Sequence, residues 1–323
     1  GQHFDDNMSQ VFFDQMNIRK PDLNLAISGG SHGKQTGEML IELEKVILDK
    51  YPDLVIVFGD TNSTLAGALA ASKLHIPVLH IEAGLRSFDM KMPEEQNRVC
   101  VDHISTFLAV PSETAKLNLN KEGINKNIVV TGDIMLDSLA MVSSINSEID
   151  NIKEIKKKYN GHYAVLTLHR ASNTDDKKLL INIINMIESM SLPVIFPVHP
   201  RTKNKFKEFG IIPAYPIQCI DPLSYFEMVE LMKGSSCILT DSGGLQKEAY
   251  FLKKPCITIR DTTEWTETVE NGCNTLVLSS KDTLDSTAFN SAVKADSSSL
   301  HFPPVYGEEN VSQRIVDLIF DVI

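Results

Sequence analysis

The chain has 323 residues, which is enough for two domains of ordinary size. Hydrophobic residues make up 42% and charged residues 23% of the sequence, and this composition excludes a disordered chain, a collagen and a coiled coil. The formal charge of −11 offers no net basic surface for a nucleic-acid partner, so an anionic ligand would need a local binding device. No apolar run approaches the roughly 18 residues of a membrane-spanning helix, and the polar first residues are unlike a signal peptide. We therefore expect a cytoplasmic protein without a membrane partner.

The first half of the chain alternates short apolar runs with polar loops and helices. Strand-length runs lie at residues 54–58, 76–80, 107–110 and 127–131, and a helix of small residues is expected at 65–74. Ser112 with Glu113 is typical of a helix start. Apolar runs that alternate with helices predict a parallel sheet with both faces covered.

The second half repeats this alternation. The expected strands are 163–168, 194–198, 237–240 and 257–259, and the expected helices are 175–190, 222–232, 245–252 and 309–322. A charged stretch at 148–159 predicts a solvated helix at a domain boundary, and the Ser/Asp/Lys-rich residues 280–300 predict a surface segment.

These elements predict an α/β fold with two Rossmann-like, doubly wound domains, at residues 1–147 and 148–323. We expect the last helix (309–323) to pack back on the first domain. Ligands of such folds bind in the loops that follow the strands, so an interdomain cleft is the expected site.

The strongest local signal is a glycine turn after the strand at 237–240. Ser242, Gly243 and Gly244 open a helix whose first N–H groups and dipole can bind an anion without a basic residue. Glu248 lies further along this helix, where its carboxylate could accept both hydroxyls of a ribose. The alternative is an ordinary helix cap made by Asp241 or Ser242.

Carboxylates gather in the loops of the first half. Asp60 ends a strand, and it either caps the helix that starts near Ser63 or works as an acid or base. Glu82 also follows a strand, and Glu94 with Glu95 follows Pro93 at the next helix start, where acids complement the helix dipole. Two arginines, Arg86 and Arg98, could neutralise some of these acids.

Histidines and arginines follow the strands of the second half. His169 and Arg170 are placed for a phosphate or a departing oxygen, although a lone histidine is more often structural. His199 and Arg260 lie beyond two further strands and are candidate ligand contacts. The glycine motifs of dinucleotide-binding folds, P-loops and serine hydrolases are absent, and no cluster has metal-ligand spacing. We expect no cofactor and no metal ion, and five cysteines without CxxC spacing are expected to be buried free thiols.

At these loops the sequence resembles the non-hydrolysing UDP-N-acetylglucosamine 2-epimerases. The matching motifs are GQH (1–3), GDTNST (59–64), HIEAGLRS (80–87), PEEQNR (93–98), TGD (131–133), LHR (168–170), PVHPR (197–201), TDSGGLQKEA (240–249) and RDTTE (260–264). The resemblance implies two domains of the glycosyltransferase-B type and a homodimer. The family pattern has a strand and a Gly-Thr-Arg-Pro loop before GQH, so we expect that first strand to be missing from this chain.

The resemblance also implies a reaction. UDP is eliminated from C1 together with the C2 proton, and it adds back to a 2-acetamidoglucal from the other face. Asp60, Glu82 and Glu94 match the family's acid/base carboxylates, and His169 matches a histidine near the diphosphate. The matched substrate contacts are Ser242 and Gly243 for the diphosphate, Glu248 for the ribose and Arg170 for a phosphate. Gln2, His3 and His199 match a region where some members bind UDP-N-acetylglucosamine as an activator.

Other functions stay open at this point. Residues 17–22 also resemble the branch that acts on UDP-2,3-diacetamido-2,3-dideoxyglucuronic acid, whose C6 carboxylate needs a cation such as Arg86 or Lys91. A hydrolysing relative would release UDP and free N-acetylmannosamine. A sugar transferase of the same fold would need an acceptor, and a nucleotide-sugar binding protein would have no turnover.

Overall fold

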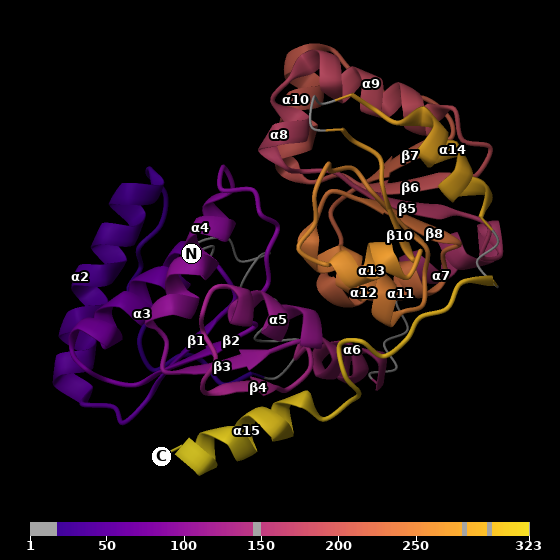
Figure 1. The fold of residues 1–323 in the computed structure, drawn as a ribbon. Helices are drawn as coiled ribbons and strands as arrows, with labels where there is room; N and C mark the ends of the chain where they lie inside the picture. Colours follow the sequence, from indigo (N-terminus) through magenta and orange to yellow (C-terminus); the bar gives the residue numbers. More distant parts are fainter. Residues whose placement is uncertain (1–17, 145–149, 280–282, 296–298, 323) are drawn as a thin grey trace. The chain divides into compact units, whose positions relative to one another are not determined.

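The computed structural model describes residues 18–144, 150–279, 283–295 and 299–322. The chain forms two compact units, unit 1 with residues 1–140 and 304–323 and unit 2 with residues 141–303 (Figure 1). The sequence pattern predicts a single boundary at 147/148, whereas the folded chain divides at 140/141 and 303/304. None of the helices in the described ranges is long and apolar enough to cross a membrane.

Unit 1 contains a four-stranded parallel sheet in the order β1-β2-β3-β4. Its elements in chain order are α2 (His32–Lys50), β1 (Val55–Phe58), α3 (Asn62–Lys73), β2 (Val78–Ile81), α4 (Pro93–Ile104), β3 (Phe107–Val110), α5 (Glu113–Lys121), β4 (Ile128–Val130), α6 (Met135–Ser144) and α15 (Val311–Val322). Ser112 caps α5 with its hydroxyl, as its sequence position predicts.

The alternation of side chains along β2 assigns the two faces of this sheet. Val78 packs with residues of α3 and α4, whereas Leu79 and Ile81 pack with Val311 and Ile315 of α15. Figure 1 shows α15 beside this sheet, with the C-terminal segment in yellow. His80 therefore points, like Val78, to the face that α4 covers.

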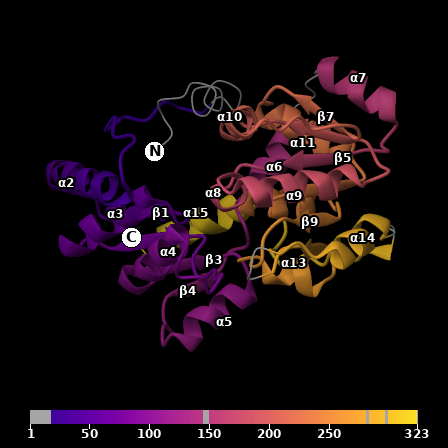
Figure 2. The ribbon, with the colours of Figure 1, turned by 90° about the horizontal axis from the view of Figure 1, so that it is seen from above.

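Unit 2 contains a six-stranded parallel sheet in the order β10-β9-β8-β5-β6-β7. Its elements in chain order are α7 (Asp150–Tyr159), β5 (Ala164–Thr167), α8 (Ala171–Thr174), α9 (Lys177–Glu188), β6 (Val194–Pro197), α10 (Pro200–Phe209), β7 (Ile217–Ile220), α11 (Tyr225–Lys233), β8 (Cys237–Thr240), α12 (Gly243–Phe251), β9 (Cys256–Thr258), α13 (Thr266–Glu270), β10 (Asn274–Leu276) and α14 (Ser286–Lys294). Side chains on one face of the sheet pack with α9 and α14, and those on the other face pack with α7, α11 and α12 (Figure 2). This is the doubly wound arrangement that the sequence predicts.

Two expectations are wrong in detail, one about residues 280–300 and one about the cysteines. Part of the predicted surface segment 280–300 is α14, whose Phe289 is buried in the core. Of the five cysteines, which were expected to be buried, Cys100 in unit 1 and Cys219 in unit 2 are exposed.

Candidate active site

Asp60 lies in the turn after β1, and its carboxylate does not cap the helix that follows. Thr61 is the N-cap of α3 and forms a capping box with Thr64, so Asp60 does not cap this helix. The Asp60 carboxylate instead accepts a hydrogen bond from Nη2 of Arg98, and its carbonyl accepts one from Nδ2 of Asn97 at 2.8 Å. Both partners lie on α4, which therefore fixes the Asp60 turn.

Glu82, immediately after β2, lies against the same turn. Its backbone has φ = +73°, the left-handed region that non-glycine residues seldom adopt and that recurs at functional sites. A Cβ atom on Gly59 would lie 3.2 Å from Oε2 of Glu82, so the glycine allows this carboxylate to approach. The structure thus brings Glu82 beside Gly59 and Asp60, as the strand-end positions predict.

The first turn of α4 separates the roles of its two glutamates. Glu95 is buried and accepts hydrogen bonds from Ser87 and from the Phe88 N–H at 2.9 Å, and Arg98 donates to it at 3.0 Å. Glu94 is half-buried and makes no hydrogen bond or ion pair within the described part of the chain. Of the two, Glu94 is the carboxylate that is not engaged by protein groups in the described residues.

Arg86 is not a neutralising partner of the loop acids that the sequence analysis considered. It is 1% exposed, donates to Asp102 at 2.6 Å, and binds Glu122 through two nitrogens at 2.7 and 2.8 Å. The pKa of Arg86 is raised: burial alone would lower it, but the hydrogen bonds and charges of Glu122 and Asp102 outweigh burial. Arg98, by contrast, pairs with Asp60 and Glu95 as expected.

In unit 2 the candidate residues converge on Asp241, at the point where the strand order changes direction. β8 pairs with β5, and the chain returns there after β6 and β7 have extended the sheet on the other side. The carboxyl ends of strands at such a switch point are where ligands of doubly wound sheets bind. Asp241 follows β8, and His169 and Arg170 follow β5.

The buried Asp241 carboxylate orients the loop after β5. It accepts from the backbone N–H of His169 at 3.0 Å and of Arg170 at 2.8 Å, and from Nδ2 of Asn173 at 3.2 Å. Nδ1 of His169 lies 3.2 Å from Oδ1 of Asp241. Burial alone would raise the pKa of Asp241, but the hydrogen bond and charge of His169 and the two backbone N–H groups lower it. An ionised Asp241 makes Nδ1 the protonated nitrogen, which leaves Nε2 as the nitrogen that can exchange a proton.

The start of α12 has the form of an anion site. Ser242 occupies the N-cap position without a side-chain capping bond, and the Asp241 carboxylate is engaged with the loop after β5, so neither side chain caps the helix. A Cβ atom on Gly243 would lie 2.4 Å from Oε1 of Glu264, so only glycine fits there without displacing Glu264. Glu264 is buried and pairs with Arg260 at 3.0 Å. Glu264 thus links Arg260 to the glycine turn at the start of α12, and the role of these residues in substrate binding stays a prediction.

Two further candidates have partners within unit 2. Glu248 is buried and accepts a hydrogen bond from Tyr225, whose pKa is raised by burial and by this carboxylate. The imidazole rings of His169 and His199 have centroids 5.4 Å apart, and Nδ1 of His199 accepts from the Arg201 N–H at 3.1 Å. The predicted ribose contact and the activator contact of His199 remain predictions.

Sequence reasoning did not assign roles to Tyr225 and Glu264, and it considered Asp241 only as a cap. Their contacts join residues far apart in the chain, which no local motif reveals. The predicted activator residues Gln2 and His3 lie outside the described residues. In the described residues no group of three or more His, Cys, Asp or Glu could hold a metal ion.

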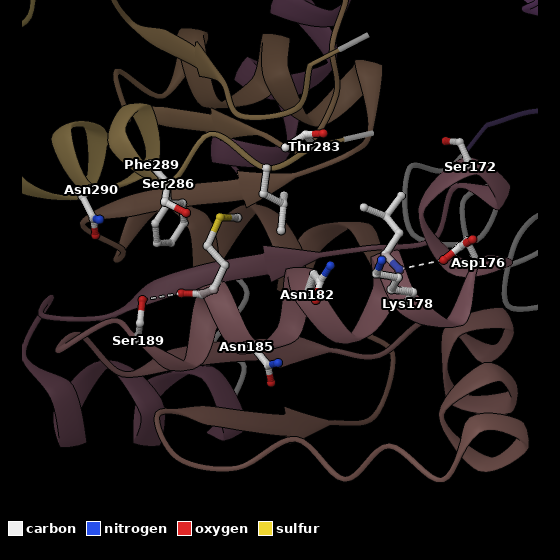
Figure 3. Close-up of a pocket in the computed structure, with 13 residues that line it drawn as sticks. Ser172, Asp176, Lys178, Asn182, Asn185, Ser189, Thr283, Ser286, Phe289 and Asn290 are labelled. Carbon is white, nitrogen blue, oxygen red and sulfur yellow. Dashed lines mark hydrogen bonds between the residues drawn. The ribbon is translucent and has the colours of Figure 1, made fainter. Parts of the chain in front are cut away.

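A cavity of about 850 Å³ in unit 2 is lined by other residues (Figure 3). Asn182 and Asn185 of α9 and Asn290 of α14 are among its lining residues, together with Phe289. None of the predicted site residues lines it. The cavity therefore takes no part in the candidate site.

The fold and these loops define a Rossmann-like α/β protein with two parallel sheets, one carrying clustered carboxylates and the other a glycine-opened helix start. The family model described as UDP-N-acetylglucosamine 2-epimerase matches residues 1–320. The chain belongs to the UDP-N-acetylglucosamine 2-epimerase family, and the predicted family and fold class are confirmed.

Two relatives and one solved structure illustrate the similarity. A UDP-N-acetylglucosamine 2-epimerase homolog of Methanococcus maripaludis is 49% identical, over 99% of this chain and 90% of the relative. The UDP-2,3-diacetamido-2,3-dideoxy-D-glucuronate 2-epimerase of Pseudomonas aeruginosa is 46% identical, over 99% and 89%. The crystal structure of the Methanocaldococcus jannaschii UDP-GlcNAc 2-epimerase in complex with UDP-GlcNAc and UDP has a TM-score of 0.89 and 43% identity, over 99% of this chain and 90% of that one.

Proposed function

We propose that this protein converts UDP-N-acetylglucosamine to UDP-N-acetylmannosamine by elimination and re-addition of UDP. The observation that carries the proposal is that one chain has both an uncapped glycine helix start, in unit 2, and three candidate acid/base carboxylates, in unit 1. The first suits a diphosphate and the second suits proton transfer. The M. jannaschii neighbour, which is 43% identical, was crystallised with UDP-GlcNAc and UDP.

In this proposal unit 2 stabilises the leaving group. The N–H groups of the first turn of α12 bind the diphosphate, and the charge that develops on the departing β-phosphate oxygen is stabilised there. His169, oriented through Nδ1 by Asp241, presents Nε2 to the diphosphate and assists its departure. Glu248 accepts the ribose hydroxyls.

The carboxylates of unit 1 move the proton at C2. This proton is weakly acidic because no carbonyl is adjacent, so departure of UDP has to run ahead and leave positive character at C1. One carboxylate of Asp60, Glu82 and Glu94 removes the C2 proton as the C1–O bond breaks, which forms the 2-acetamidoglucal and UDP. Protonation of C2 on the opposite face and return of UDP to C1 complete the epimerisation.

A second substrate has a specific observation in its favour, because a diacetamidoglucuronate 2-epimerase is 46% identical to this chain. That substrate carries a C6 carboxylate, which needs a cation. Arg86 cannot supply it, since it is buried and bound to Asp102 and Glu122. Lys91 is exposed in the loop before α4 and is the cation that we propose for this substrate.

Product analysis tests both the reaction and its non-hydrolysing nature. The protein is incubated with UDP-N-acetylglucosamine, and the products are followed by proton NMR at the anomeric signals. We expect UDP-N-acetylmannosamine to approach an equilibrium with the substrate. Accumulation of UDP with free N-acetylmannosamine would show a hydrolysing enzyme, and absence of any C2 epimer would refute the proposal. The same assay with the diacetamidoglucuronate substrate, on wild type and Lys91→Ala, tests the second candidate.

Two properties that the family resemblance implies are part of the proposal. A homodimer is expected, and sedimentation or light scattering measures it directly. UDP-N-acetylglucosamine is expected to act as an activator through His199, which would give sigmoidal dependence of the rate on its concentration.

A further inference from the structure

A buried polar network lies beneath the carboxylates of unit 1. His80 on β2 is fully buried, with Nδ1 at 2.7 Å from Oδ1 of Asp102 and Nε2 at 2.8 Å from the carbonyl oxygen of Gly59. The other carboxylate oxygen of Asp102 accepts from the Gly84 N–H at 3.1 Å and from Arg86 at 2.6 Å. The reaction proposed above gives none of these groups a role.

The hydrogen-bond partners determine the charge of His80. A carbonyl oxygen can only accept, so Nε2 must carry a hydrogen. The Asp102 carboxylate is ionised and also only accepts, because its other oxygen takes hydrogen bonds from the Gly84 N–H and from Arg86, whose guanidinium always carries its charge. Nδ1 must therefore carry a hydrogen as well, and a ring with two N–H groups is an imidazolium cation.

The charges of this network are paired. Arg86 donates to both Asp102 and Glu122, and the Glu122 side chain is partly exposed to solvent and also lies 3.8 Å from His103. An imidazolium at His80 is a second cation beside the fully buried Asp102 carboxylate, and buried charges persist where they are paired and hydrogen-bonded in this way.

The network reaches both carboxylates that lie beside Gly59. Asp102 holds the side chain of His80 and the N–H of Gly84, which are two residues before and two residues after Glu82. Glu82 has its left-handed backbone between these two anchors. His80 also holds the Gly59 carbonyl, whose peptide bond joins Gly59 to Asp60, and the Glu82 carboxylate lies against Gly59. One buried pair thus anchors both turns.

We propose that His80 is a protonated, buried imidazolium that, with Asp102, positions Asp60 and Glu82 for proton transfer. The proposal rests on the proposed function for the step that it serves. His80 and Asp102 touch neither substrate nor reacting atoms and act through the two turns. A misplacement of about 1 Å in a proton-transfer group costs about 100-fold in rate, so these residues affect turnover more than binding.

The first readout does not depend on activity. In protein labelled with ¹⁵N-histidine, the His80 resonances are identified by their loss in His80→Gln. If that variant does not fold, they are identified as the histidine signals that shift in Asp102→Asn, because Asp102 is the hydrogen-bond partner of His80. At pH 7 we expect both ring nitrogens of His80 to have the chemical shift of protonated nitrogens. One nitrogen with the shift of an unprotonated imidazole nitrogen would overturn the assignment.

The second readout separates positioning from general destabilisation. His80→Gln can donate only one of the two hydrogen bonds, and Asp102→Asn places an amide against the Gly84 N–H or Arg86. Ser112→Ala is the matched control, since it removes the N-cap of α5 in the same unit and leaves the side chains of His80 and Asp102 in place. We expect kcat to fall about 100-fold in the first two variants with KM nearly unchanged, and to stay near wild type in the control.

The outcomes distinguish the two proposals. If wild type shows no epimerisation, the proposed function fails, whereas the ¹⁵N spectrum still decides the charge of His80. If wild type turns over and His80→Gln and Asp102→Asn, when folded, lose no more activity than Ser112→Ala, the positioning role is refuted.

Discussion

Replacement of Asp241 by asparagine removes one charge from the centre of the unit 2 site. The carboxylate accepts three N–H groups of His169, Arg170 and Asn173 and faces Nδ1 of His169. Asparagine keeps one acceptor oxygen and turns an N–H₂ group toward Nδ1 of His169. The hydrogen bond with Nδ1 of His169 is then lost, and the hydrogen bonds from the backbone of His169 and Arg170 and from Asn173 go to a neutral group. Hydrogen bonds to charged groups contribute about 1.5–3 kcal/mol and neutral ones about 0.5–1.5 kcal/mol, so we expect a loss of about 3–5 kcal/mol in the free energy of unfolding.

The assay uses a probe that lies within unit 2. Trp265 is the only tryptophan of the chain and is buried in this unit, so its fluorescence during urea titration reports unfolding there. The matched control is Asp175→Asn, which removes a half-exposed pair with Arg201 and should cost less than about 1 kcal/mol. We also expect kcat to fall about 100-fold or more in Asp241→Asn, because His169 loses the partner that holds its tautomer. Equal stabilities and equal rates for the two variants would refute this account of Asp241.

Three further predictions follow from the same structure. Glu94→Gln should lower kcat about 100-fold or more, because it removes a candidate acid/base group. The midpoint of urea unfolding and the Kd for UDP should stay near wild type, since Glu94 makes no hydrogen bond within the described residues. A variant with wild-type turnover would contradict its role. Gly243→Ala should weaken UDP binding in calorimetry by at least about tenfold because its Cβ would lie 2.4 Å from Glu264, and unchanged affinity would contradict the anion site. Asp102 and Asp241 have pKa values below the ordinary 3.8, so their stabilisation is complete above that pH and is lost as pH falls through the lowered values. Urea midpoints measured at pH 7, 5 and 3.5 should therefore fall at the lowest pH, and a constant midpoint would contradict the two shifts.

Continuous apolar runs made most of the strands predictable. The runs at 163–168 and 237–240 contain β5 and β8, which are buried in the middle of their sheet. β7 and β10 were not predicted, because they are the edge strands of unit 2 and their burial is incomplete. The helix α2 was also missed, since only Met39 and Ile47 of its 19 residues are fully buried and its pattern carries many charges.

The candidate site was predictable where a residue follows a strand. Asp60, Glu82 and His169 were found in this way, because carboxyl ends of parallel strands share one edge of the sheet. The residues that hold these three side chains in place could not be predicted from the sequence. Asp241 binds the backbone of residues about 70 positions earlier, and Arg86 binds Glu122, 36 positions later at the end of α5, so only the folded chain shows which charges are engaged.

The most direct test of the account follows the hydrogen at C2. The protein is incubated with UDP-N-acetylglucosamine in deuterated water, and C2 of substrate and product is followed by NMR. Removal of the C2 proton by a carboxylate of unit 1 predicts deuterium at C2 of UDP-N-acetylmannosamine from the first turnovers, and loss of this exchange in Asp60→Asn, Glu82→Gln or Glu94→Gln. A C2 epimer that retains its original hydrogen, or full exchange in all three variants, would contradict the account.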